Sequence, residues 1–206
     1  MFRSKIIPKI LCWLAALIGL SPNSHAETER KSLLGMGLSA AEKTEYFGWF
    51  HLREIDRQTD AQGQTTVSFK PEGESVRDFV TVKVVVKEDK IVAIQLVLSR
   101  TFVEDRRTNG ILARDISKSL LLDAIPEADQ LQIRDLVAAI QSNPENSDMI
   151  VLSNKPQTHV DPLTPGYQAY LGKQQSYKRQ LSNTLLIIEN TGERGAEVLQ
   201  IKVSAK

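Results

Sequence analysis

Few side chains in the sequence could act as metal ligands or nucleophiles. The chain has three histidines, His25, His51 and His159, and a single cysteine, Cys12. A zinc site needs three or four ligands, and neither an HExxH nor a His-x-His pattern is present. We therefore expect no metal site and no cofactor. His51 and His159 are interpreted as core or surface residues.

One stretch, Gly166 to Lys173 (GYQAYLGK), imitates a phosphate-binding loop. Five residues separate its two glycines instead of four, and Gln174 stands where a serine or threonine would ligate magnesium. The serine hydrolase patterns GxSxG and SxxK are also missing. A catalytic triad or a carboxylate pair is a geometry that spacing does not reveal, so a hydrolase with an unmarked active site stays open as an alternative.

Aromatic residues concentrate in the run Phe47 to His51, and again at Tyr167 and Tyr170. If the first run is a strand, Phe47, Trp49 and His51 share one face. Core packing is the simplest interpretation of these residues. If any surface recognises a ligand or a partner, however, the exposed members of this set are the first candidates.

The densest charged patch is Glu104-Asp105-Arg106-Arg107. The simplest interpretation is a solvated corner between a strand and a helix, where exposed ion pairs contribute little to stability. A contact surface for a partner protein is the alternative. The candidate ligand or partner surface therefore comprises Phe47, Trp49, His51, Tyr167, Tyr170, Glu104, Arg106 and Arg107.

The first 26 residues are typical of a secretory signal peptide. Three basic residues precede the apolar run Ile10–Leu20, which is too short to span a bilayer comfortably. Small residues at Ser24 and Ala26 predict cleavage after Ala26. We expect a periplasmic or secreted protein made of a flexible leader, residues 27–38, and a single domain, residues 39–206.

Cleavage would change both the charge and the thiol content of the chain. It removes three of the 26 basic residues, none of the 25 acidic ones and the only cysteine, which leaves a net charge of −2 and no disulfide. A nearly neutral chain offers no electrostatic reason to expect nucleic acid or an anionic membrane as a partner. No other apolar run approaches the length of a membrane span.

The centre of the predicted core is Phe79–Phe102, in which two apolar runs flank the polar corner Lys87–Lys90. In the first run alternate valines from Val80 to Val86 share a face, and in the second Val92 shares a face with Ile94, Leu96 and Leu98. This alternation predicts a β-hairpin with one buried face. The corner lacks Asn-Gly, which leaves the turn type open.

Elements on either side complete the expected topology. Ser39 and Glu42 suggest a capping box and a short helix from Ala40 to about Tyr46. Besides the hairpin, strands are expected at Phe47–Arg57, Thr65–Lys70, Tyr167–Leu171, Gln180–Glu189 and Ala196–Ser204, and Asp148–Leu152 is a candidate for a further short strand.

Two amphipathic helices, separated by Pro126, are predicted between Asn109 and Asn143. The segregation of strands and helices predicts an α+β fold with a mainly antiparallel sheet, in the order β-β-β-β-α-α-β-β-β. The helical hairpin should pack on one face of this sheet. We also expect the C-terminal strands to join it.

Three functions are compatible with these observations. The first is an exported, soluble, non-catalytic binding or accessory protein of the cell envelope. The second is a carrier that encloses a lipid or small apolar ligand between sheet and helices. The third is the hydrolase with an unmarked site. The sequence does not identify the protein partner or the apolar ligand.

Overall fold

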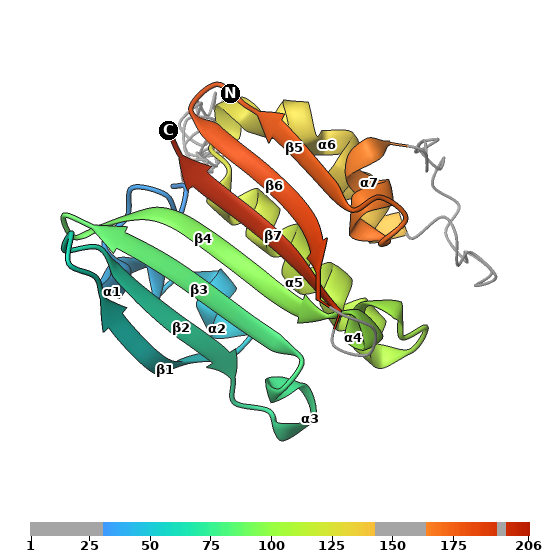
Figure 1. Cartoon of the computed structure of the whole chain (residues 1–206), viewed down its shortest axis with the longest axis horizontal. Helices are drawn as coiled ribbons and strands as arrows, with labels where there is room; N and C mark the ends of the chain where they lie inside the picture. The colour runs from blue at the N-terminus through green and yellow to red at the C-terminus, as the bar shows by residue number, and fades with distance from the viewer. Residues whose placement is uncertain (1–30, 143–163, 193–196) are drawn as a thin grey trace, which may run out of the picture.

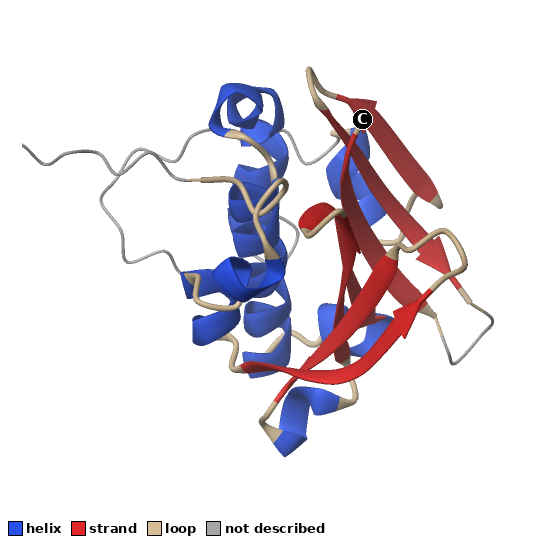
Figure 2. Cartoon of the chain, turned by 90° about the vertical axis from the view of Figure 1, so that its left-hand side faces the viewer, coloured by secondary structure: helices blue, strands red, loops and turns tan. Residues whose placement is uncertain are grey.

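The computed structural model describes residues 31–142, 164–192 and 197–206, and it contains one seven-stranded antiparallel sheet. The strand order is β1-β2-β3-β4-β7-β6-β5, so β4 and β7 join the two halves of the chain. Figure 1 shows this arrangement, and Figure 2 shows the long helices on one side of the sheet. The α+β class, the helical hairpin and the joining of the C-terminal strands to the sheet are confirmed.

The described elements follow in chain order. The N-terminal half contains α1 (Leu38–Ala41), α2 (Glu45–Trp49), β1 (Leu52–Thr59), β2 (Thr65–Pro71), α3 (Glu74–Arg77), β3 (Val80–Lys87), β4 (Lys90–Ser99) and α4 (Arg100–Glu104). The C-terminal half contains α5 (Thr108–Ala124), α6 (Glu127–Ser142), α7 (Pro165–Tyr170), β5 (Ser176–Gln180), β6 (Thr184–Thr191) and β7 (Val198–Ala205). The strand expected at Asp148–Leu152 lies outside the described residues.

The central hairpin of β3 and β4 forms as predicted. Glu88 and Asp89 both have positive φ angles, 51° and 59°, which is the conformation of a type I′ turn. A register shift places Val85 opposite Ala93 and Val86 opposite Ile91. Because one residue is therefore extra in β4, Ile91 faces the core in place of the expected Val92.

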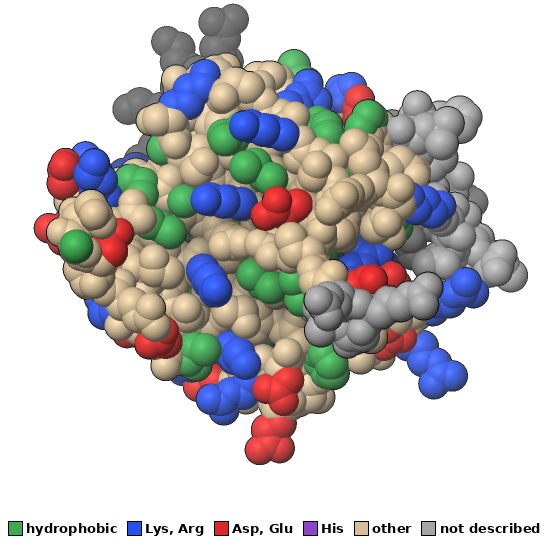
Figure 3. Space-filling view, in the orientation of Figure 1, with side chains coloured by type: hydrophobic (Ala, Val, Ile, Leu, Met, Phe, Trp, Pro, Cys, Tyr) green, Lys and Arg blue, Asp and Glu red, His purple; other side chains and the backbone are tan. Residues whose placement is uncertain are grey.

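The core lies between the inner face of the sheet and α5, α6 and α7. The sheet contributes alternate residues of its central strands, such as Val82, Leu96 and Ile201, all fully buried. The helices contribute their predicted apolar stripes, for example Ile116 and Ile140. Among the described residues no helix covers the outer face, and Figure 3 shows its apolar side chains interspersed with Lys and Arg rather than gathered in one patch.

Two aromatic stretches predicted as strands are helices. Residues 45–49 form α2, and His51, with φ 47°, reverses the chain before β1 begins at Leu52. Residues 165–170 form α7, so the fifth strand is Ser176–Gln180 instead of Tyr167–Leu171. In both places five or six residues are too few to show a helical period.

Smaller corrections concern the N-terminal segment. Gly37 precedes α1 and no side chain caps it, so the capping box predicted at Ser39 does not form. Within the predicted leader, Leu33 is buried and its N–H donates to the Asp123 carbonyl at 2.7 Å. Ser32 Oγ donates to the Ala124 carbonyl, so this segment closes the C-terminal end of α5.

Candidate functional site

Of the three predicted surface residues in α2 and just after it, one is buried and two are exposed. Phe47 packs edge-on against Phe69 of β2, with ring centroids 5.1 Å apart, and belongs to the core. Trp49 is 78% exposed, the highest value among the large apolar residues of the described chain. His51 is exposed as well. The expectation that Phe47 and Trp49 share a strand face is wrong because this stretch is helical.

Tyr167 and Tyr170 do not contribute to a surface. Both are buried in α7, with their rings stacked at 6.3 Å. Burial raises the pKa of Tyr170 to about 12, with the nearby Ser117 hydroxyl acting in the opposite direction. Helix α7 contacts β5 and β6, whereas α2 contacts β1 at the other edge of the sheet, so the two aromatic groups do not meet.

Trp49 lies beside a surface hollow of about 240 Å³ between α2 and α5, which we call the Trp49 hollow. Its lining comes from two elements: Glu45, Tyr46, Trp49 and Phe50 from α2 and its C-terminal end, and Lys118, Ser119, Leu122 and Asp123 from α5. Aromatic rings and charged groups therefore face the same space. The residues of α5 were missed from sequence because only the tertiary fold brings them to α2.

Tyr46 distinguishes this hollow from ordinary surface. Three buried side-chain oxygens of the described residues have no hydrogen-bond partner, those of Tyr46, Thr164 and Tyr170. Thr164 borders residues 143–163, Tyr170 lies near Ser117, and neither lines the Trp49 hollow. Burial, with a further contribution from the Asp123 carboxylate, raises the pKa of Tyr46 far above its ordinary value, so its hydroxyl stays protonated.

Glu104 of the predicted charged corner belongs to a buried hydrogen-bond network centred on the guanidinium of Arg100. The sequence did not single out Arg100 as a candidate. Arg100 is 6% exposed. Its Nη1 donates to the Tyr170 carbonyl at 2.8 Å, and its Nη2 donates to the Leu171 carbonyl at 2.7 Å. Nη2 also donates to Glu104 Oε1 at 2.8 Å, so Glu104 is an ion-pair partner while its own side chain is 62% exposed. Arg106 and Arg107 are exposed.

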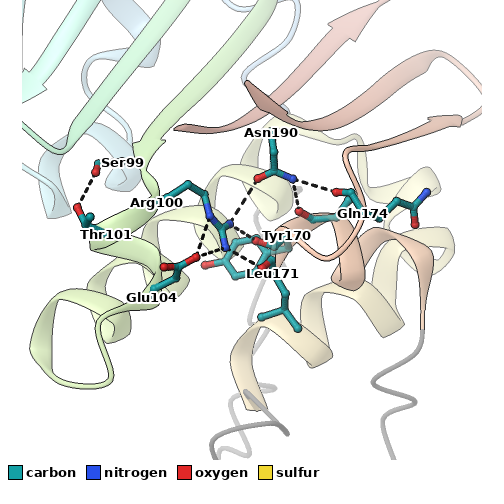
Figure 4. A network of polar contacts seen from close by, with 9 residues as sticks. Ser99, Arg100, Thr101, Glu104, Tyr170, Leu171, Gln174 and Asn190 are labelled. Carbon is teal, nitrogen blue, oxygen red and sulfur yellow. Dashed lines mark hydrogen bonds and ion pairs between the residues drawn. The ribbon is translucent and has the colours of Figure 1, made fainter. Parts of the chain in front are cut away.

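Asn190 of β6 completes this network, which Figure 4 shows from close by. Its Oδ1 accepts from Arg100 Nη1 at 3.5 Å, and its Nδ2 donates to the carbonyls of Ala169 and Gln174. We call Arg100, Glu104, Asn190 and the last turn of α7 the Arg100 lock. A cation at a helix C-terminus satisfies carbonyls that have no partner within the helix. A lone arginine in the apolar run LVLSRTFV was the sequence signal for it.

A second buried anchor is Asp129 of α6. Its carboxylate accepts from the backbone N–H groups of Ser182 and Asn183, at 3.1 and 3.4 Å, and from the Thr184 hydroxyl. Burial alone would raise the pKa of Asp129, but these hydrogen bonds outweigh it and hold the pKa below its usual range. Asp129 therefore fixes the β5–β6 turn to α6.

The surroundings of His51 do not resemble a catalytic centre. Of the carboxylates near it in sequence, Glu54 pairs with Arg57 and Asp56 accepts from Gln58. The Glu72 carboxylate accepts from Arg53 Nε at 2.6 Å, and this contact lowers its pKa. Across residues 31–142, 164–192 and 197–206, no group of three histidine, cysteine or acidic residues is arranged to bind a metal ion.

Within the described part of the chain, no helix combines the length and apolar character required to cross a membrane. Comparison with protein-family models, with curated proteins and with solved structures gives no significant match.

Proposed function

We propose that this protein is an exported, non-catalytic binding protein of the cell envelope that recognises a partner protein through the Trp49 hollow. Export is inferred from the signal-like first 26 residues. The observation that carries the binding function is Trp49, which is 78% exposed and lies at a hollow also lined by Tyr46, whose hydroxyl has no hydrogen-bond partner among the described residues. Tryptophan and tyrosine are the residues most enriched where binding energy concentrates.

The size of the hollow favours a partner's side chain over a free ligand. Sites for small molecules commonly have volumes of about 300–1,000 Å³. The Trp49 hollow measures about 240 Å³, and Trp49 in its lining is 78% exposed to solvent. A protruding side chain of a partner protein is a suitable occupant, and the exposed indole would then be covered by the surrounding interface.

The two alternatives receive less support. A carrier would need space between sheet and helices, but side chains such as Leu96 and Leu120 fill that interior, and the Trp49 hollow lies outside it. A hydrolase would need a base near a nucleophile, and His51 is exposed with its neighbouring carboxylates engaged by arginines and a glutamine.

Site-directed photo-crosslinking in the envelope of the protein's own host tests the proposal. A benzophenone amino acid is placed at position 49 and, in a matched control, at position 131. Leu131 of α6 is 74% exposed, nearly as much as Trp49, and does not line the hollow.

We expect one adduct of discrete mass at position 49 and none at position 131. Equal adducts at both positions would indicate unspecific contact and overturn the proposal. The absence of any adduct at position 49 would overturn it as well.

A further inference from the structure

We propose that the Trp49 hollow receives a basic side chain, an arginine or lysine of the partner protein, with its cationic head between the aromatic rings and the two carboxylates. This inference rests on the proposed function and adds the chemistry of recognition.

The charges of the hollow favour a cation. Glu45 and Asp123 contribute two carboxylates and Lys118 contributes one ammonium group, which leaves one negative charge in excess. A carboxylate can accept from several donors, so a partner's guanidinium can be added to the contacts these groups already make. An anionic side chain would face both carboxylates with a single lysine to offset them.

The aromatic residues suit the rest of a basic side chain. Tyr46 and Phe50 meet edge to face with ring centroids 5.6 Å apart, and Trp49 stands exposed beside them. Cations are attracted to the faces of such rings, most strongly to tryptophan. The aliphatic stem of arginine or lysine can lie along apolar surface while its head reaches the polar groups.

The Tyr46 hydroxyl provides a further contact for the cationic head. It is buried and lacks a partner among the described residues. A neutral phenol oxygen accepts a hydrogen bond, and an N–H of guanidinium or ammonium can donate one. The Asp123 carboxylate contributes to the raised pKa of Tyr46, which indicates a negative potential at this side chain. Such a potential attracts a cation and repels an anion.

Tryptophan fluorescence tests this inference directly. The only other tryptophan is Trp13, so the Trp13→Phe chain reports on Trp49 alone. The probe is the peptide acetyl-Ala-Arg-Ala-amide, and the matched control replaces arginine with citrulline, which has nearly the same shape and no charge.

We expect a saturable fluorescence change with the arginine peptide and binding about three- to tenfold weaker with the citrulline peptide. Glu45→Gln should weaken arginine binding severalfold, and Lys118→Gln should strengthen it, because the two side chains carry opposite charges. Tyr46→Phe should also weaken binding. All three variants should keep a cooperative thermal transition, which separates lost recognition from lost folding.

The outcomes distinguish the two proposals. If both peptides bind equally or neither binds, while the adduct at position 49 persists in the envelope, the basic side chain is wrong and the proposed function stands. If Glu45→Gln and Lys118→Gln shift the affinity in the same direction, the charge argument is overturned. If the adduct at position 49 is also absent, both proposals fail.

Discussion

The Arg100 lock and the Trp49 hollow differ in whether their buried polar groups have hydrogen-bond partners. In the lock, all three guanidinium nitrogens of buried Arg100 donate to protein oxygens, and Asn190 is bonded through both ends of its amide. In the hollow, the buried Tyr46 hydroxyl has no partner among the described residues, and Trp49 is left in solvent. A buried polar network in which every group has a hydrogen-bond partner stabilises a fold. A buried polar group without a partner requires an explanation, and the binding of a ligand that supplies the missing hydrogen bond is one.

The lock should account for the larger share of stability. We expect Arg100→Met to lower the free energy of unfolding by about 3 kcal/mol, because it leaves buried carbonyls and the Asn190 amide without a donor. Arg53→Met is the matched control, since Arg53 pairs with Glu72 at an exposed position. The control should cost less than about 0.5 kcal/mol. Urea denaturation measures both, and equal losses would show that the lock is not a stabilising network.

Asp129 provides a test with a pH signature. We expect Asp129→Asn to cost about 2 kcal/mol at pH 7, because it weakens the hydrogen bonds from Ser182, Asn183 and Thr184. The folded-state pKa of Asp129 is lowered, so its stabilisation is present above its unfolded pKa of about 3.9 and is lost as the pH falls through the folded value.

Denaturation of both chains between pH 7 and pH 2 checks this sign. The stability difference between them should shrink in acid. A difference that is constant over this range would contradict the proposed hydrogen bonds to the ionised carboxylate.

Gly172 connects backbone conformation to the lock. It follows α7 with φ +77°, and an added Cβ would stand 2.8 Å from Arg100 Nη2. Gly63 has nearly the same φ, +76°, but open space around it. Gly63→Ala should cost about 1 kcal/mol for the left-handed conformation alone, and Gly172→Ala about 2 kcal/mol. Equal costs in thermal or urea denaturation would mean that Arg100 moves aside freely.

The predictable part of the fold is the part with long periodic signals. The alternation of apolar and polar residues in Phe79–Phe102 and the helical apolar stripe that includes Ile116 and Leu120 extend over many residues. Each pattern therefore fits only one type of secondary structure. Helices α2 and α7 are too short for a period, and aromatic residues suit either structure. The structure of α7 nevertheless had a sequence signal, because Pro165 opens it and Gly172 closes it.

The candidate site was less predictable because it depends on tertiary contacts. Trp49 could be selected from sequence as a recognition residue, but Phe47 and Tyr167, selected by the same criterion, are core residues. Residue type does not distinguish an exposed aromatic side chain from a buried one. Lys118 and Asp123 reach the hollow only because α5 packs beside α2, and no spacing within the chain indicates this pairing.

The smallest expected change in the free energy of unfolding is that of Tyr46→Phe, and it is a gain in stability where the other variants lose stability. Tyr46→Phe should raise the free energy of unfolding by about 1 kcal/mol, because a buried hydroxyl without a partner costs desolvation and gains no hydrogen bond. Thr184→Val is the matched control, since the buried Thr184 hydroxyl donates to Asp129 at 3.4 Å. The control should lose about 1 kcal/mol.

Opposite signs in urea denaturation of these two chains would mean that Tyr46 is retained at a cost to stability, as expected for a residue that serves binding. A loss of stability in Tyr46→Phe equal to that in Thr184→Val would mean instead that the Tyr46 hydroxyl is satisfied within the folded chain. The Trp49 hollow would then lack the feature that sets it apart from the Arg100 lock, and the exposed indole alone would have to support the binding function.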